Sequence, residues 1–260
     1  MSNDLPGVDV DLADGILRVT LNRPARMNAV QTETLEAVAD AFDKYADDSA
    51  VRVVLLTGTG RAFCSGADLA GKDLSAPPSA DTIDAANRVA ATIRAFPRPV
   101  IGAVNGAAAG VGVSLALSCD LTVAKESSYF LLAFAKIGLM PDGGASALVA
   151  ASIGRARALK MALLAERLPA PEALQAGLIA DVYADDEFDT AVEQLATRLA
   201  QGPTSALGST KCAINDATLT ELDNAFARER AGQLELLGSA DFTEGVSAFR
   251  EKRPAVFGRG

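Results

Sequence analysis

The sequence predicts an α/β protein whose chain closes with a helical region. In the first half, short apolar or β-branched runs alternate with segments whose apolar residues recur at helical spacing. Glycine-rich turns follow two of the apolar runs, as expected where a buried strand leads into a helix. Beyond residue 183 strand-like runs cease and helical spacing continues toward the end of the chain. We therefore expect an α/β core followed by packed helices.

The elements of the core follow from these local patterns. Strands are expected where the chain is continuously apolar or β-branched, and helices where apolar residues share one helical face. The predicted strands span residues 16–21, 53–56, 100–104, 121–124 and 129–132. The predicted helices span residues 32–46, 82–95 and 112–118. Pro97 and Pro99 end the second of these helices.

One uncharged stretch also fits a membrane helix. Residues 100–119 carry no charge, and Gly102, Gly106 and Gly110 form a G-x-x-x-G-x-x-x-G series typical of dimerising membrane helices. The stretch is nevertheless mostly small residues, and Asn105-Gly106 is a turn signal. We therefore favour a strand, a turn and a short helix here, and expect no membrane partner.

The second half is predicted to be mainly helical. Its predicted helices span residues 145–153, 156–167 and 171–176, and a last strand spans residues 179–183. Phe188, Val192 and Leu195 share one face of a further helix, and Thr218-x-x-Glu221 reads as a capping box opening a long helix to Leu237. We expect a core over residues 1–200 and a C-terminal helical trimerisation subdomain over residues 201–260.

Composition excludes several kinds of site. The chain has no histidine, which removes Ser-His-Asp and Cys-His nucleophilic sites and imidazole bases. Its three cysteines are too few and too scattered for an all-cysteine zinc site or a redox pair, so we expect no metal and mostly buried, reduced thiols. The formal charge of −9 disfavours nucleic acid as a partner. No secretory signal is visible at the N-terminus, which predicts a cytoplasmic location.

Three segments could carry chemistry. Residues 61–69 and residues 105–114 each join a predicted strand to a helix through glycines, a geometry that leaves backbone N–H groups able to bind an oxyanion. Asp142 lies between a proline and two glycines just before an apolar helix. Taken alone, the glycine turns could be mere packing devices and Asp142 a helix N-cap. The alternative role for Asp142 is a lone carboxylate base whose pKa is raised by burial.

Together with Leu21-Asn-Arg-Pro24, Met27-Asn28 and the segment from Phe242 to Lys252, these segments resemble the enoyl-CoA hydratase/isomerase, or crotonase, superfamily. The resemblance runs from about residue 10 to the C-terminus. It implies a spiral of ββα turns with a trailing helical region, assembled as a homotrimer or a dimer of trimers. It also implies that the chain binds acyl-CoA and stabilises its enolate, with no cofactor beyond the coenzyme A of the substrate.

The resemblance assigns roles to particular residues. Backbone N–H groups of Ala67 and Val111 match the two oxyanion-hole donors, although the family most often has glycine at the second position. The C-terminal positions Phe249 and Lys252 match residues that reach a CoA held largely by a neighbouring subunit. The remaining expected substrate and CoA contacts are Arg26, Met27, Arg61, Ser65, Gly66, Asp68, Leu69 and Gly110.

The departures from the family pattern decide between activities. Hydratases of the family use two glutamates, and the matching positions here are Ser114 and Phe134, which we expect to be pocket residues. Asp142 matches the single acidic base of several isomerases, including those resembling the phenylacetate-pathway isomerase. The favoured hypothesis is therefore an enoyl-CoA isomerase. An enoyl-CoA hydratase of fatty-acid β-oxidation and a non-catalytic acyl-CoA-binding protein remain as alternatives.

Overall fold

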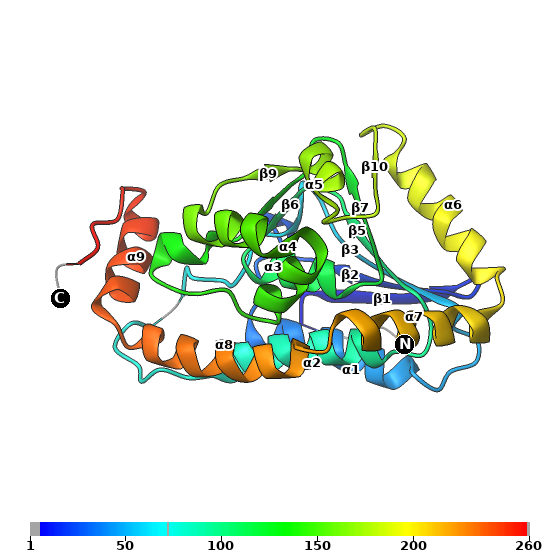
Figure 1. Ribbon diagram of the computed structural model, residues 1–260, viewed down its shortest axis with the longest axis horizontal. Coiled ribbons are helices and arrows are strands. Elements are labelled where there is room, and N and C mark those ends of the chain that lie inside the picture. The colour runs from blue at the N-terminus through cyan, green and yellow to red at the C-terminus, as the bar shows by residue number, and fades with distance from the viewer. Residues whose placement is uncertain (1–5, 72, 259–260) are drawn as a thin grey trace.

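The computed structural model describes residues 6–71 and 73–258, which form two sheets surrounded by helices (Figure 1). The expectation of no secretory signal concerns an N-terminal segment whose residues 1–5 lie outside the described residues. The larger sheet has six strands in the order β1-β2-β3-β5-β7-β10. Its strands are β1 (Val8–Ala13), β2 (Ile16–Leu21), β3 (Val53–Gly58), β5 (Val100–Val104), β7 (Leu121–Lys125) and β10 (Asp181–Tyr183).

The smaller sheet lies beside the larger one and has four strands in the order β4-β6-β8-β9. Its strands are β4 (Ala62–Cys64), β6 (Ala107–Ala109), β8 (Tyr129–Leu131) and β9 (Leu168–Pro169). Three consecutive turns of the chain each place one strand in the larger sheet and the next strand in the smaller one: β3 then β4, β5 then β6, and β7 then β8. Pairing is parallel throughout these turns. This arrangement confirms the predicted α/β spiral.

Helices close the turns and bury the sheets. Helices α1 (Thr32–Tyr45) and α2 (Asp81–Ala95) pack together beneath the larger sheet, and α3 (Val111–Ser118) is buried within the core (Figure 1). Helix α6 (Phe188–Ala200) covers the opposite face, where its Phe188 and Val192 join the buried Ile16, Val53 and Leu55. Strand β3 is thus buried on both faces, which explains its unbroken apolar run.

Glycines bring the backbone of the 100–119 stretch close to its neighbours. A Cβ on Gly106 would clash with the Arg61 carbonyl and lie 3.1 Å from Ala62 Cα. A Cβ on Gly112 would clash with the Cys64 carbonyl and lie 2.9 Å from Cys64 Cβ. A Cβ on Gly102, in β5, would lie 3.1 Å from the Ala116 carbonyl oxygen of α3. Glycines of this stretch therefore allow close packing between strands and α3, as favoured from the sequence. Among the described residues, no helix is long and apolar enough to cross a membrane.

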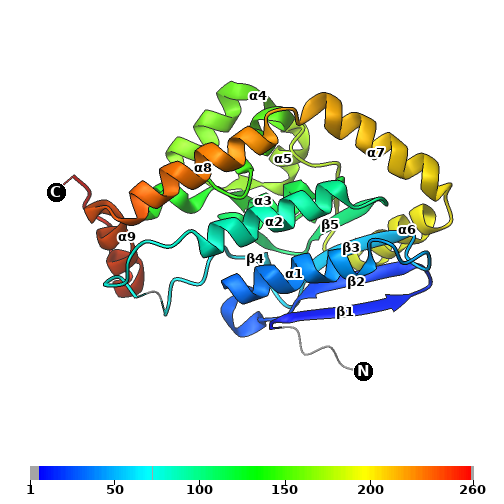
Figure 2. The ribbon, with the colours of Figure 1, turned by 90° about the horizontal axis from the view of Figure 1, so that it is seen from below.

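The C-terminal part of the chain is helical, as predicted. Helices α4 (Ala145–Leu164) and α5 (Ala170–Ala176) precede α6, and α7 (Thr204–Thr218), α8 (Leu222–Leu237) and α9 (Ala240–Glu251) follow it. Figure 2 shows α7 and α8 running along α2 and α4 toward α9. The expected boundary at residue 200 coincides with the end of α6. Whether the last 60 residues trimerise stays a prediction.

Several local expectations were wrong. Short strands β4, β6 and β9 were missed, and so was β1, an edge strand. The capping box does not exist, because Thr218 ends α7 and its hydroxyl donates to the Ile214 carbonyl, while Glu221 makes no capping bond.

The predicted break between helices near residue 154 is real: Gly154 has a non-helical φ of 75° inside α4. Cys64 and Cys119 are buried, whereas Cys212 is exposed.

Candidate active site

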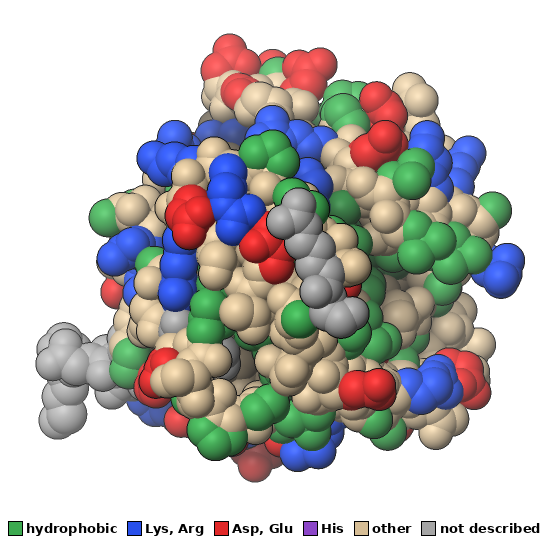
Figure 3. Space-filling view, turned by 90° about the vertical axis from the view of Figure 1, so that its left-hand side faces the viewer, with side chains coloured by type: hydrophobic (Ala, Val, Ile, Leu, Met, Phe, Trp, Pro, Cys, Tyr) green, Lys and Arg blue, Asp and Glu red, His purple; other side chains and the backbone are tan. Residues whose placement is uncertain are grey.

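The cavity that contains the predicted site has a volume of about 590 Å³ and lies between the two glycine turns, η2 (Ala133–Ile137) and α9. Its lining is largely apolar. Asp68 and Asp142 are the carboxylates among the described residues that line it. The cavity includes most of the predicted residues: Arg26, Met27, Arg61, Ser65, Gly66, Ala67, Asp68, Leu69, Gly110, Val111, Phe134, Asp142 and Phe249. The end of the molecule beside α9 carries acidic, basic and hydrophobic side chains interspersed with one another (Figure 3).

Two backbone amides in this cavity have no partner within their own element. Val30 and Ala67 form a parallel bridge in which Val30 N donates to Gly66 O and Asp68 N donates to Val30 O, each at 2.9 Å. The Ala67 N–H therefore points away from that bridge. Val111 is the first residue of α3, a position whose N–H has no acceptor inside the helix.

Glycines hold these two amides close to each other. Gly66 has a φ of +103° and Gly110 a φ of +54°, backbone conformations that residues with a side chain rarely adopt. A Cβ on Gly110 would lie 3.6 Å from Gly66 Cα. The residues immediately before Ala67 and Val111 thus touch, and both amides border one cavity. Two convergent N–H donors can bind a developing oxyanion.

Asp142 borders the same cavity and keeps part of its surface open to it. The pKa of the Asp142 carboxyl is raised to about 7, mainly because burial removes its hydration. A hydrogen bond from Gln233 lowers this pKa by a smaller amount, and the nearby negative charge of Glu229 raises it. The turn that carries Asp142 packs on α3, since a Cβ on Gly143 would lie 2.9 Å from Ser114 Cβ and 3.5 Å from Val111 Cγ2. A carboxyl that titrates near neutrality can act as a general base.

The two positions that match hydratase glutamates hold no acid or base. Phe134 is buried in η2, and its Cζ would lie 3.9 Å from a Cβ on Gly110. Ser114 is buried beneath the cavity and does not line it; its hydroxyl donates to the Asp142 carbonyl at 2.7 Å. The expectation that Ser114 lines the pocket was therefore wrong, because the 140–144 segment covers it.

The remaining predicted residues are arranged around the mouth of the cavity. Asp68 forms an ion pair with Arg23 at 2.9 Å. The buried side-chain amide of Asn28 donates hydrogen bonds to the Thr59 and Ala62 carbonyls and accepts one from the Arg23 N–H. These bonds fix the loop that carries Arg26 and Met27. Arg250 donates to the Leu69 carbonyl at 2.8 Å and so ties α9 to the opposite wall.

Of the two C-terminal residues, one lines the cavity. Phe249 is 60% exposed and borders the cavity of its own chain. Its expected contact with a CoA held by a neighbouring subunit stays a prediction. Lys252 caps the end of α9 and does not line the cavity.

Several residues of the site were not predicted from the sequence. The apolar wall is completed mainly by side chains of β8 and of the segment after it. Two buried polar residues of α8, Glu229 and Gln233, contact the Asp142 segment from about 90 residues further along the chain. The missed lining residues are Ala25, Ala29, Ala70, Thr82, Ala86, Ala109, Tyr129, Leu131, Ala133, Lys136, Ile137 and Leu139.

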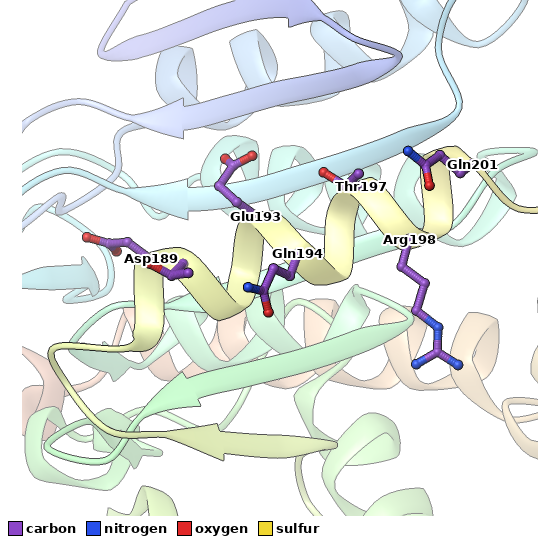
Figure 4. A pocket seen from close by; sticks show the side chains of 7 residues that line it. Asp189, Glu193, Gln194, Thr197, Arg198 and Gln201 are labelled. Carbon is purple, nitrogen blue, oxygen red and sulfur yellow. The ribbon is translucent and has the colours of Figure 1, made fainter.

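A shallow hollow elsewhere on the surface follows the exposed side of α6 (Figure 4). Its lining residues, among them Asp189 and Gln194, come from this helix and from Gln201, the residue that follows it. It contains no group predicted to carry chemistry, and its residues provide control positions for the experiments below.

A family model for enoyl-CoA hydratase/isomerase matches residues 11–260. The chain belongs to the enoyl-CoA hydratase/isomerase family. A relative from Escherichia coli K12 named 1,2-epoxyphenylacetyl-CoA isomerase is 40% identical over 94% of this chain and 95% of its own. Another from the same organism, named 2,3-dehydroadipyl-CoA hydratase, is 37% identical over 93% of this chain and 94% of its own. The predicted resemblance to the family and to its phenylacetate-pathway isomerases is thus confirmed.

Solved structures of the enoyl-CoA hydratase/isomerase family share the fold. An enoyl-CoA hydratase from Mycobacterium avium subsp. paratuberculosis K-10 is 50% identical, with a TM-score of 0.92 over 98% of this chain and 99% of that one. An enoyl-CoA hydratase/isomerase from Pseudoalteromonas atlantica is 33% identical, with a TM-score of 0.87 over 97% of this chain and 100% of that one. The names of these relatives include both isomerases and hydratases.

Proposed function

We propose that this member of the family is an acyl-CoA isomerase that moves a carbon–carbon double bond with Asp142 as its single base. One observation carries the proposal. Of the two described carboxylates in the cavity wall, Asp68 is paired with Arg23, and Asp142 has a pKa raised by burial to about 7. A cavity with one available proton carrier suits a proton shift.

The proposed reaction needs only these groups. The Ala67 and Val111 amides donate hydrogen bonds to the thioester oxygen, and the Asp142 carboxylate removes a proton from the carbon next to the double bond. The electron pair left on carbon delocalises to the thioester oxygen as a dienolate, held by both amides. The protonated Asp142 then returns the same proton at the other end of the conjugated system. Loss of one oxyanion donor in comparable sites costs about 10²- to 10³-fold in rate.

The lining of the cavity supports an apolar acyl group. Phe134, Leu131 and Leu139 lie on the wall near Asp142, where an apolar acyl chain or ring would bury its surface. Arg26 and Arg61 line the same cavity and are exposed, and we assign them to the phosphates of coenzyme A. We also propose a homotrimer or dimer of trimers, to be measured by analytical ultracentrifugation.

The hydratase alternative is favoured by the names of relatives, such as the probable enoyl-CoA hydratase of Rhodobacter capsulatus at 39% identity. Hydration requires activation of water as well as delivery of a proton to carbon. In this chain Asp142 would have to do both, because Ser114 and Phe134 stand where the hydratase glutamates would be.

The test is a paired assay of the wild type and Asp142→Asn on a 3-enoyl-CoA and the matching 2-enoyl-CoA in heavy water, with products resolved by mass. We expect double-bond migration in the wild type and a loss of at least about 10²-fold in Asp142→Asn, with CoA-ester binding retained. Asp189→Asn, on the exposed side of α6, is the matched control and should keep full activity.

Three outcomes would contradict the proposal. Migration that persists in Asp142→Asn would remove the residue from its role. Hydration without migration would establish the hydratase alternative. Binding of both esters with no product and no deuterium uptake would indicate a non-catalytic acyl-CoA-binding protein.

A further inference from the structure

Two polar side chains of α8 are buried against the segment that carries Asp142. Glu229 and Gln233 are each 1% exposed, although they come from a helix whose neighbouring residues face solvent. They are four residues apart and therefore lie on the same face of α8. Burial of an amide and a carboxyl is unfavourable unless each polar atom has a partner.

The Gln233 amide has a fixed orientation. Its Oε1 accepts a hydrogen bond from the Met140 N–H at 3.2 Å, and its Nε2 donates to Asp142 Oδ2 at 2.8 Å. Because the Met140 N–H is a donor, the amide oxygen must face it. The NH₂ group must then face Asp142, where it can only donate.

The geometry points to Gln233 as a positioning residue for Asp142, an inference that rests on the proposed function. Gln233 holds Asp142 Oδ2 as a hydrogen-bond acceptor, so that Oδ1 alone takes up and returns the substrate proton. A protonated Oδ2 would set a hydroxyl against the NH₂ group of Gln233, donor against donor. The proton of the acid form therefore resides on Oδ1, the oxygen to which Gln233 does not donate.

Glu229 fixes the other side of the same segment. Its two carboxylate oxygens accept hydrogen bonds from the Gly144 N–H at 2.7 Å and the Ser146 N–H at 2.8 Å, at the first turn of α4. Gln233 bonds Met140 before Asp142, and Glu229 bonds Gly144 after it. Helix α8 thus holds the base from both sides along the chain.

Helix α8 packs closely on Met140 at Gly232. A Cβ on Gly232 would clash with Met140 Sδ, so a side chain at this position would require the end of the Met140 side chain to move.

Both α8 residues also influence the proton affinity of the base, in opposite directions. The hydrogen bond from Gln233 lowers the pKa of Asp142, and the negative charge of Glu229 raises it. Other charged residues near the site include Arg228, which acts on Glu229, and the cavity-lining Lys136, Arg26, Arg61 and Asp68. None of these is altered by the substitutions below.

The experiment compares wild type with Gln233→Met, Gln233→Glu and Glu229→Gln. The Asp142 carboxyl is titrated in the free enzyme by ¹³C NMR after aspartate labelling, with its signal assigned through Asp142→Asn. We expect the midpoint to move up in Gln233→Met and down in Glu229→Gln. In Gln233→Glu the side chain keeps its volume and can still accept the hydrogen bond from the Met140 N–H. It can donate to Asp142 only when it is protonated, so the Asp142 midpoint should also move up in this variant.

Kinetics on a 3-enoyl-CoA provide the second readout. In Gln233→Met we expect kcat to fall about 10²-fold with little change in KM. The reason is that a misplaced Asp142 carboxylate no longer lies in the geometry needed to attack the substrate proton. Gln194→Leu on α6 is the control for loss of a glutamine and should leave both the kinetics and the titration unchanged.

An unchanged Asp142 midpoint in both Gln233 variants, or shifts of the same sign in Gln233→Met and Glu229→Gln, would overturn the proposal. The titration needs no turnover. It therefore tests this inference separately from the proposed function. If the midpoints move as expected but the wild type does not isomerise the ester, the proposed function fails and the role of Gln233 in holding Asp142 stands.

Discussion

At the scale of single residues, the function depends on how one carboxyl is solvated. Asp142 lies in an apolar cavity wall, and burial raises its pKa far more than its hydrogen bond lowers it. Asp68 lines the same cavity but is paired with Arg23. Two aspartates in one cavity therefore have different roles, set by their surroundings rather than by their chemistry.

The raised pKa predicts a particular pH dependence. Only the carboxylate form of Asp142 can accept a proton, and its pKa is about 7. We expect kcat/KM for isomerisation to be level above neutrality and to fall about tenfold per pH unit below it. The measurement is kcat/KM between pH 5 and 9, with Gln194→Leu as a control. A profile that stays level down to pH 5, as expected for an aspartate with the ordinary pKa of 3.8, would contradict the assignment.

The sequence was sufficient to predict the residues of the site that belong to local motifs. Asp142, Ala67 and Val111 lie in or beside glycine-containing turns, and the resemblance of those segments to the family singled them out. Gln233 and Glu229 carry no such mark, since polar residues on an amphipathic helix are usually solvent-facing. Their partners come from a segment about 90 residues earlier, and only the folded chain brings the two together.

At the scale of elements, the active site depends on how closely α3 packs against β4. Gly112 lies against the Cys64 backbone, and Val111 immediately before it provides one amide of the cavity. Long apolar runs such as β3 could be predicted from the sequence. The short, alanine-containing strands β4 and β6 could not, because their pairing rather than their composition defines them.

This packing predicts the effect of one added methyl group. Gly112→Ala should force α3 away from β4, reduce the free energy of unfolding by about 1–3 kcal/mol and lower activity by displacing the Val111 amide. Urea unfolding and the isomerase assay measure the two effects. Gly71→Ala is the control, because a Cβ there would meet nothing within 4 Å. Equal effects of both substitutions would contradict the explanation.

At the scale of the whole molecule, the C-terminal helices are part of the site rather than an appendage. Helix α8 holds the Asp142 segment, and α9 packs on η2, where a Cβ on Gly245 would lie 2.5 Å from Ile137 Cα. Helix α7 is fastened to the core by the buried Lys211, which pairs with Asp120 at 2.9 Å and donates to the Ile93 carbonyl at 2.8 Å.

The buried ion pair predicts a large loss of stability when it is broken. Lys211→Met leaves the Asp120 carboxylate buried without its cation, and we expect the free energy of unfolding to fall by about 3–5 kcal/mol. Arg228→Met removes an exposed ion pair with Glu221 and should change the free energy of unfolding by less than about 1 kcal/mol. Denaturant unfolding of both variants measures the difference, and similar losses would show that burial is unimportant here.

The path of the chain also sets the order in which the site is completed during synthesis. A nascent chain that has left the ribosome as far as α6 already contains both amide donors and Asp142. It does not yet contain Glu229 or Gln233, the side chains that orient the carboxylate and bind the turn around it. In the proposed mechanism proton transfer therefore awaits translation of the last helices. A chain released early from the ribosome would contain the two amides without the side chains that bind the Asp142 segment.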